Sequence, residues 1–210
     1  QMEIVLEVLG QRLRGYYDIE RSLGDGNSAL IFLLKDVFTQ RRVVTEVLKV
    51  PVLSEAIKNE IRAVSQLKHR NIIKLLGESL DRFPFYIICE YVNGPTLPIV
   101  LEKTGPRPAS QAVDWLFQLA DALSYLRQKK ILHSNIRPSK IYIDEEQHMM
   151  ISPFDIIKAG MNERTLGKFR EDCQYLSPEY LRGDGEPASF QSMRYSDQFS
   201  IGLVAYKMLT

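Results

Sequence analysis

The stretch that decides the fold reads His133-Ser134-Asn135-Ile136-Arg137-Pro138-Ser139-Lys140-Ile141-Tyr142-Ile143. It begins at a histidine, passes a proline and ends in three residues with high β propensity, so it predicts a loop that leads into a strand. Asn135 carries an amide of nearly the same size as a carboxylate. Because an amide cannot take up a proton, Asn135 can orient a hydroxyl group but cannot act as a general base.

The composition is that of a globular protein. The chain has 210 residues, of which 45% are apolar, enough to bury a core. Lys and Arg number 27 against 26 Asp and Glu, so the overall charge does not favour nucleic acid or a membrane surface as a partner. Three isolated histidines do not favour a zinc site.

Cysteine usage and hydropathy point to the cytoplasm. Cys89 and Cys173 lie far apart without a C-x-x-C spacing, which is typical of a reduced intracellular protein. No apolar run reaches the roughly 20 residues of a membrane span, and the N-terminal residues lack the basic region of a signal peptide. The chain starts at Gln and stops inside an apolar helical pattern, which suggests a segment of something longer.

The first half of the chain predicts mainly strands. Strands are expected at 17–23, 30–34 and 43–50, forming an antiparallel meander, followed by a helix that starts near Ser54 and has apolar residues at helical spacing. Two further strands are expected at 72–76 and 86–91, before the chain is broken at Asn93-Gly94-Pro95.

The second half predicts mainly helices. One long helix carries an apolar face formed by Trp115, Leu119, Leu123 and Leu126. A short strand pair is expected on either side of the polar turn 144–147. The segment 200–209 is apolar almost all round, which is typical of a helix buried at the centre of a domain.

Several motifs occur in a fixed order along the chain. Gly24-Asp25-Gly26-Asn27-Ser28-Ala29 lies between two predicted strands, and by itself it is equally well explained as a hairpin turn. Lys49 follows Val47-Leu48, and Glu60 lies in the next predicted helix. Further along come Cys89-Glu90-Tyr91-Val92, the His133 stretch, Ser152-Pro153-Phe154-Asp155, Ser177-Pro178-Glu179 and Asp197.

In this order, the motifs resemble those of a serine/threonine-type protein-kinase domain, and the resemblance covers about residues 17–210. It implies an α+β, two-lobed fold with an antiparallel β-sheet N-lobe and a mainly helical C-lobe that ends after its central helix. The expected boundaries are an N-terminal extension at 1–15, an N-lobe at 16–92 and a partial C-lobe at 93–210. Within residues 1–15, the apolar residues fit either an interface helix or a strand, and their period does not decide between the two: Ile4, Val5, Leu6, Val8 and Leu9.

The resemblance also implies a site for ATP. Lys49, held by Glu60, would grip the α- and β-phosphates, and the glycine-containing turn would cover them. The residues expected to line this site are Gly24, Gly26, Ile31, Val47, Lys49, Glu60, Cys89, Glu90 and Val92. The alternative for Lys49 and Glu60 is a strand lysine and a solvated helix glutamate.

The same comparison shows a loss of catalytic groups. Asn135 stands where the family has its catalytic Asp, while Lys140 and Pro153 stand where it has its two magnesium ligands. A realignment that uses Asp155 as a ligand shifts the motif by two residues. One preorganised electrostatic contact is typically worth about 10²–10³ in rate, so losing all three groups should abolish ordinary turnover.

Other departures concern regulation. Ser134 replaces an Arg that in many kinases receives a phosphorylated residue, so control by that route is not expected. The segment 156–176 is short, with Thr165 and Tyr175 as its hydroxyl-bearing members.

Asp197 should hold the backbone of the catalytic loop. Further helices normally cover the central helix of the family and supply an Arg partner for Glu179. Without them, Glu179 should lack that partner, and four apolar residues should lose their cover: Leu203, Val204, Met208 and Leu209.

The sequence therefore predicts a pseudokinase, a catalytically inactive regulatory or scaffolding domain. It is expected to act through a protein partner or other domains of a longer chain, and to bind ATP without a normal magnesium site. The first alternative is an unconventional active kinase that uses Asp155 as its metal ligand. The second is a purely structural module with an empty cleft, in which Lys49 and Glu60 form only a surface bridge.

Overall fold

The structure is a computed structural model that describes residues 2–26, 29–131, 133, 136–152, 174–178 and 190–210. The described residues form two compact units. The first contains residues 2–67 and 74–91, and the second contains residues 68–73 and those from Val92 onward.

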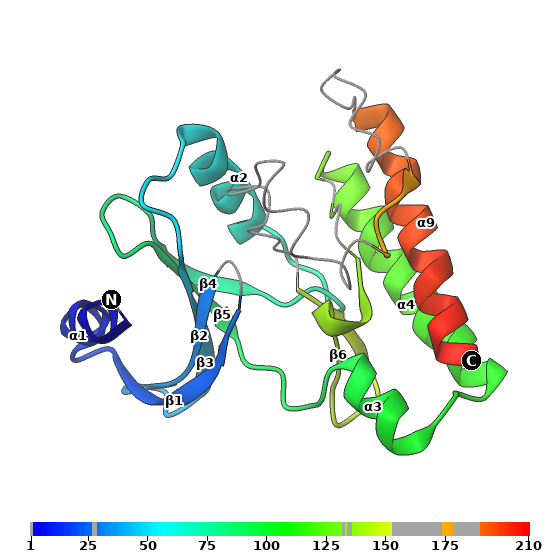
Figure 1. The fold of residues 1–210 in the computed structure, drawn as a ribbon, viewed down its shortest axis with the longest axis horizontal. Helices are drawn as coiled ribbons and strands as arrows, with labels where there is room; N and C mark the ends of the chain where they lie inside the picture. The colour runs from blue at the N-terminus through cyan, green and yellow to red at the C-terminus, as the bar shows by residue number, and fades with distance from the viewer. Residues whose placement is uncertain (1, 27–28, 132, 134–135, 153–173, 179–189) are drawn as a thin grey trace. The chain divides into compact units, whose positions relative to one another are not determined.

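A five-stranded antiparallel sheet forms most of the first unit (Figure 1). Its strands lie in the order β1-β2-β3-β5-β4, so that β5 is inserted between β3 and β4. The bounds are β1 Tyr17–Asp25, β2 Ala29–Asp36, β3 Arg42–Leu48, β4 Leu75–Ser79 and β5 Tyr86–Glu90. The predicted meander of the first three strands is confirmed, with β3 ending one residue before Lys49.

Helix α2, Glu55–Ser65, follows this meander as the sequence predicts. The side chain of Ser54 accepts a hydrogen bond from the backbone N–H of Ile57, which satisfies one of the donors left open at a helix start. Ile61 and Val64 form the buried face of the helix.

The N-terminal residues form helix α1, Met2–Leu13, which packs on the sheet of the first unit (Figure 1). Leu9 and Leu13 are buried among apolar side chains of β2, β3 and β5. The guanidinium group of Arg12 donates to the carbonyl oxygens of Phe83 and Pro84 at 2.8 and 3.0 Å, which ties the helix to the segment before β5. Residues 2–13 are therefore an integral part of the first unit, which the sequence pattern did not decide.

The strand predicted at 72–76 is misplaced. Strand β4 starts only at Leu75, while Ile72 forms an isolated parallel bridge with Ile151. The backbone N–H of Ile73 donates to the carbonyl of Ile151, and the N–H of Ile151 donates to the carbonyl of Asn71, at 2.9 Å each. The sequence pattern of Ile72 and Ile73 does not distinguish a strand from such a bridge, because these apolar side chains are buried in either case.

Among its described residues, the second unit contains the long helices α4 and α9, the shorter helix α3 and a small hairpin (Figure 1). The predicted turn at 144–147 joins the two strands of the hairpin, which is confirmed. The bounds are α3 Leu97–Thr104, α4 Ala109–Gln128, the 3-10 helix η1 Pro138–Lys140, β6 Ile141–Ile143, β7 Met149–Ile151 and α9 Phe190–Leu209.

Helices α4 and α9 pack against each other. Trp115, Leu119 and Leu126 of the predicted face of α4 are buried, and Leu123 is half-buried. In α9, Val204 and Met208 are fully buried, whereas Tyr206 and Leu209 are 66% and 48% exposed. Two predictions are therefore wrong: α9 is not buried all round, and Val204 and Met208 do not lose their cover, since the described residues already bury one face of the helix.

No helix within the described part of the chain combines the length and the apolar character that crossing a membrane requires.

Candidate functional site

The glycine-containing turn joins β1 to β2, at the end of the sheet where β3 also ends. Asp25 is the last residue of β1 and lies opposite Leu30, while Gly24 lies opposite Ile31 next to a bulge in β1. A side chain at Gly26 would come within 3.2 Å of the carbonyl of Ala29, so the turn is tight there. Gly26 thus follows the end of β1, as the sequence predicts, whereas Gly24 lies within β1, which runs to Asp25 rather than ending at Leu23.

Lys49 contacts this turn directly. Its ammonium group forms an ion pair with the carboxylate of Asp25 and donates to the carbonyl oxygen of Gly26 at 2.8 Å. Lys49 reaches Asp25 because Leu48, the residue before it, pairs with Ala29 at the start of β2. The sequence analysis did not predict Asp25 as the partner of Lys49. The signal for it was the acidic residue between two glycines at the end of a predicted strand.

Glu60 lies on α2, where the sequence places it, and it is exposed. Its pairing with Lys49 stays a prediction, as does the role of both residues in holding phosphates.

Three of the predicted lining residues lie in the central strands of the sheet. Val47 is 1% exposed and lies between Leu30 of β2 and Tyr86 of β5 in the antiparallel register. Cys89 is buried on β5 opposite Val44, and Ile31 is half-buried on β2. The sheet therefore holds these side chains in fixed positions relative to the glycine-containing turn.

Glu90, the last residue of β5, and Val92, just after it, have backbone groups that form hydrogen bonds within the chain. The N–H of Glu90 donates to the carbonyl of Lys74 at 2.9 Å, and the Glu90 carboxylate accepts the N–H of Lys74 at 2.7 Å. In the second unit, the carbonyl of Val92 accepts the N–H of Gly94 at 3.0 Å. Glu90 therefore closes the edge between β5 and β4 with both its backbone and its side chain.

In the second unit, His133 is held by hydrogen bonds from its backbone and from its ring. The backbone N–H of His133 donates to Oδ2 of Asp197 at 3.3 Å. The ring Nε2 of His133 lies 2.7 Å from the carbonyl oxygen of Ser152, just after β7. Both His133 and Asp197 are buried, at 4% and 9% exposure. The predicted role of Asp197 in holding this backbone is confirmed.

Lys140 ends the 3-10 helix η1 at the start of β6 and is half-buried. The N–H of Ser152 donates to its carbonyl at 3.0 Å, so the backbone at Lys140 is fixed to the end of β7. An ammonium group has no lone pair to give to a metal ion. The side chain at this position therefore does not fit a magnesium ligand.

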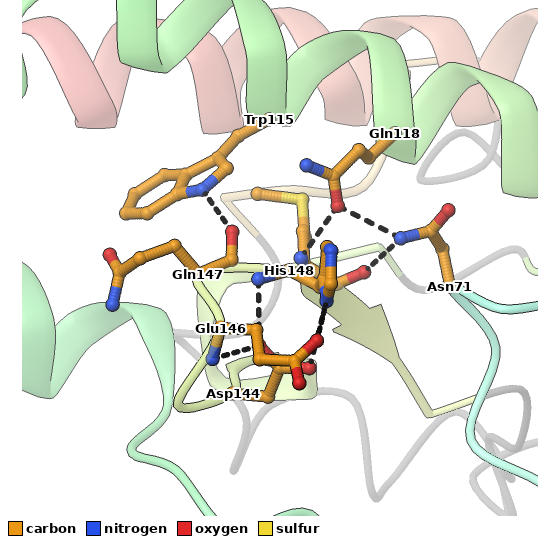
Figure 2. A network of polar contacts seen from close by, with 8 residues as sticks. Asn71, Trp115, Gln118, Asp144, Glu146, Gln147 and His148 are labelled. Atoms are coloured by element: carbon orange, nitrogen blue, oxygen red, sulfur yellow. Dashed lines mark hydrogen bonds and ion pairs between the residues drawn. The ribbon is translucent and has the colours of Figure 1, made fainter.

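A polar network joins residue 71 to helix α4 and strand β7 (Figure 2). The side-chain oxygen of Gln118 accepts two hydrogen bonds, one from the amide of Asn71 at 2.9 Å and one from the backbone N–H of Met149 at 2.8 Å. The Asn71 amide also donates to the carbonyl of Met149 at 2.8 Å. Because Asn71 is 1% exposed, these bonds replace those that water would supply. Sequence reasoning missed this network.

The β6–β7 turn is tied to the same helix. The indole N–H of Trp115 donates to the carbonyl of Gln147 at 3.0 Å. Asp144 accepts the backbone N–H groups of Glu146 and His148 at 2.9 and 2.7 Å, which closes the turn (Figure 2). The network therefore fixes the hairpin that carries Lys140 at one end and Ser152 at the other.

Gly94 is required by a close approach of the backbone. A side chain at this position would place its Cβ 1.8 Å from the carbonyl oxygen of Ile143. Next to it, the carbonyl of Pro95 accepts the N–H of Ile143 at 2.9 Å, and Thr96 forms an isolated bridge with Tyr142. The sequence pattern marks Gly94 as a chain break, but only the structure shows that it lies directly against β6.

The short segment 174–178 is connected to α9. The hydroxyl of Ser200 donates to the carbonyl of Tyr175 at 2.7 Å, and the hydroxyls of Ser177 and Ser196 lie 2.8 Å apart. Burial raises the pKa of the Tyr175 hydroxyl. This segment is therefore fixed to the helix that also holds His133.

Several predicted site residues lie outside the described residues: Ser134, Asn135, Pro153, Asp155, Thr165, Cys173 and Glu179. Within the described ranges, no group of three or more His, Cys, Asp or Glu side chains is arranged to hold a metal ion. Asp155 as a metal ligand therefore stays a prediction.

The family to which the chain belongs follows from a comparison with known protein families. The family model of the protein kinase domain matches residues 17–210, which is most of the chain. The chain therefore belongs to the protein kinase domain family, and the predicted α+β fold with an antiparallel sheet followed by a mainly helical part is confirmed.

Similar proteins are named as protein kinases, two of the three below as serine/threonine-protein kinases. The serine/threonine-protein kinase PrkC of Bacillus subtilis is 29% identical, and the match covers 97% of this chain and 32% of that protein. PknB of Mycobacterium leprae is 29% identical over 92% of this chain and 32% of its own. CBL-interacting protein kinase 21 of rice is 28% identical over 93% of this chain and 38% of its own. The chain thus spans about a third of the length of these relatives.

Proposed function

We propose that this chain is a pseudokinase, a domain of the protein kinase family that binds ATP without efficient phosphotransfer and regulates or scaffolds other proteins. The observation that carries the proposal is the position of Lys140. The backbone there is held by Ser152, next to the intact contact between His133 and Asp197, while its side chain cannot bind a metal ion. The backbone contacts at His133 and Lys140 are thus retained, whereas a side chain that can bind a metal ion is missing at position 140.

Loss of the base supports the same conclusion. Asn135 has no group that can take up the proton of a substrate hydroxyl, and Pro153 offers no side-chain ligand. Phosphoryl transfer depends almost entirely on positioning and on neutralising the moving phosphoryl group. Without the base and both metal ligands, the chain can bind a nucleotide but lacks the groups that accelerate transfer.

Binding of ATP would rest on the first unit. When bound, ATP would supply the phosphates that Lys49 and the glycine-containing turn contact, and its magnesium ion would lack the two ligands that the family provides. The contact of Lys49 with the carbonyl oxygen of Gly26 at 2.8 Å supports this part of the proposal, because it brings the lysine next to the glycine-containing turn.

The partner is proposed to be a protein or another domain of a longer chain. The net charge of +1 offers no attraction for nucleic acid or for an anionic membrane surface. A domain without turnover affects a pathway only through what it contacts, so its function would be measured as a change in the activity or assembly of a protein partner.

A second candidate function is an unconventional active serine/threonine kinase that transfers the γ-phosphate of ATP to protein. The observation that favours it is that similar proteins such as PrkC of Bacillus subtilis are named as kinases. In this chain it would need Asp155 as its metal ligand.

The experiment that separates the two is a phosphotransfer assay with γ-labelled ATP, magnesium or manganese, and a mixed protein substrate. We expect no labelling above that of Lys49→Ala. Labelling that requires Lys49 would overturn the pseudokinase proposal. If this labelling also disappears in Asp155→Ala but not in Asp114→Ala, an exposed control on α4, the second candidate is supported.

A further inference from the structure

We propose that Asp25 is an internal competitor of the nucleotide phosphates for Lys49 and lowers the affinity of this domain for triphosphates. The inference rests on the proposed nucleotide site, and it concerns how strongly that site discriminates between ligands of different charge.

The geometry comes from the register of three strands. Asp25 ends β1, Ala29 begins β2 and Leu48 ends β3, and these ends are neighbours in the order β1-β2-β3. Lys49 comes directly after β3 and extends past the start of β2 to reach Asp25. The register of the strands therefore brings Asp25 and Lys49 close enough for their side chains to form the ion pair.

The ammonium group of Lys49 has two oxygen partners in this arrangement. One is the carboxylate of Asp25, and the other is the carbonyl of Gly26 at 2.8 Å. Both oxygens come from the same turn that would cover the phosphates. A phosphate group that binds Lys49 must therefore either displace the carboxylate or share the ammonium group with a second negative charge.

The exposure of the pair makes this exchange feasible. The side chains of Lys49 and Asp25 are 36% and 60% exposed, so the pair contributes little to the stability of the fold. A weak pair can open when a ligand arrives. Its opening lowers the affinity for the ligand, and the like charge of Asp25 lowers it further as the ligand becomes more negative.

Asp25→Asn is the direct test, because it keeps the size of the side chain and removes its charge. We expect ATP to bind about three- to tenfold more tightly, the order expected from removing one partly screened like charge. ADP should gain less than ATP, and adenosine should gain nothing. The gain should shrink at high salt, since screening weakens the repulsion between exposed charges.

Asp18→Asn is the matched control. Asp18 is also exposed on β1, but it lies opposite Lys35 at the other end of the strand, so the same change in net charge should leave ATP affinity unaltered. Equal gains in both variants would show a general effect of charge and would overturn the inference.

A second measurement does not depend on nucleotide. The Lys49 amine should react faster with an acylating reagent in Asp25→Asn than in the wild type, because its carboxylate partner is gone. The rate is read by mass spectrometry and normalised to Lys35. An unchanged rate would show that the pair does not form and would overturn the inference.

The outcomes separate the inference from the proposed function. If Lys49→Ala abolishes ATP binding and Asp25→Asn leaves it unchanged, the nucleotide site stands and the inference is wrong. If neither the wild type nor Asp25→Asn binds ATP, both the nucleotide site and the competition are excluded. If ATP binds only to Asp25→Asn, the inference is supported in its strongest form.

Discussion

Asp197 accepts the backbone N–H of His133 at 3.3 Å, a contact between the middle of helix α9 and a residue 64 positions earlier in the chain. A side chain that accepts a hydrogen bond from a buried backbone N–H satisfies that donor without taking part in chemistry. The sequence that follows His133 carries Asn135 and Lys140, which the proposed function interprets as a loss of catalytic groups.

Replacing Asp197 by Ala should therefore destabilise the second unit. A buried backbone N–H would lose its partner, which costs about 1–3 kcal/mol. Urea unfolding measures the change in the free energy of unfolding. Asp197→Asn keeps an oxygen acceptor and should recover part of the loss, while Asp114→Ala on the exposed side of α4 should change little. Equal stability of Asp197→Ala and Asp114→Ala would contradict the role of the contact.

Gly94→Ala should be strongly destabilising. The new Cβ would lie 1.8 Å from the carbonyl oxygen of Ile143, and a backbone atom can give way only if the paired strand moves. We expect a cost of about 3 kcal/mol, the upper end for overpacking, measured as a lower unfolding midpoint.

The control for this prediction is Gly10→Ala. No atom lies within 4 Å of its added Cβ, and the position is inside helix α1, so the change should stabilise the protein by about 0.5–1 kcal/mol. Opposite signs for the two substitutions are the expected result. A neutral Gly94→Ala would mean that the approach to β6 is not as close as described.

Asn71→Ala should loosen the attachment of residues 68–73 to the second unit. The change removes the amide that donates to Gln118 and to the carbonyl of Met149, and it leaves a cavity at a position that is 1% exposed. We expect a loss of about 2–4 kcal/mol. Hydrogen exchange should report faster exchange of the Met149 N–H, whereas Asn59→Ala on the exposed side of α2 should leave that rate unchanged.

Glu78 should make the stability of the first unit depend on pH. Burial raises the pKa of its carboxyl group, a nearby Arg62 lowers it and Asp81 raises it, and the pKa lies above its ordinary value. The folded state then binds a proton more tightly than the unfolded state. Between the unfolded and folded pKa values, the free energy of unfolding falls as pH rises, and this loss is complete above the folded pKa.

Glu78→Gln removes this dependence. Its free energy of unfolding should change less with pH across that window than that of the wild type, as measured by urea unfolding in a pH series. A carboxyl NMR titration of Glu78 checks the cause directly, and a pKa at or below that of an ordinary glutamate would contradict it.

The regular parts of the fold could be predicted from the sequence because local signals and packing agree there. Ser54 is both the residue type that caps a helix and the observed cap of α2. The polar turn 144–147 separates two short apolar runs, and the structure pairs them as β6 and β7. In α4, the helical spacing of Trp115, Leu119 and Leu126 matches the buried face.

What could not be predicted depends on partners distant in the chain. Ile72 and Ile73 have the composition of a strand, but their hydrogen bonds go to the neighbourhood of Ile151. The apolar residues among 2–13 show no clear period, so only packing on the sheet decides that this segment forms a helix. The contact of Lys49 with Asp25 also depends on strand register, which residue types alone do not reveal.

The most direct test of the account is a calorimetric titration of the domain with ATP, with and without magnesium, alongside Lys49→Ala. A pseudokinase that holds the phosphates with Lys49 and lacks metal ligands should bind ATP with similar affinity in both conditions, and Lys49→Ala should remove the binding. Binding that requires magnesium would contradict the account and favour catalysis through Asp155. The absence of any heat would contradict the nucleotide site itself.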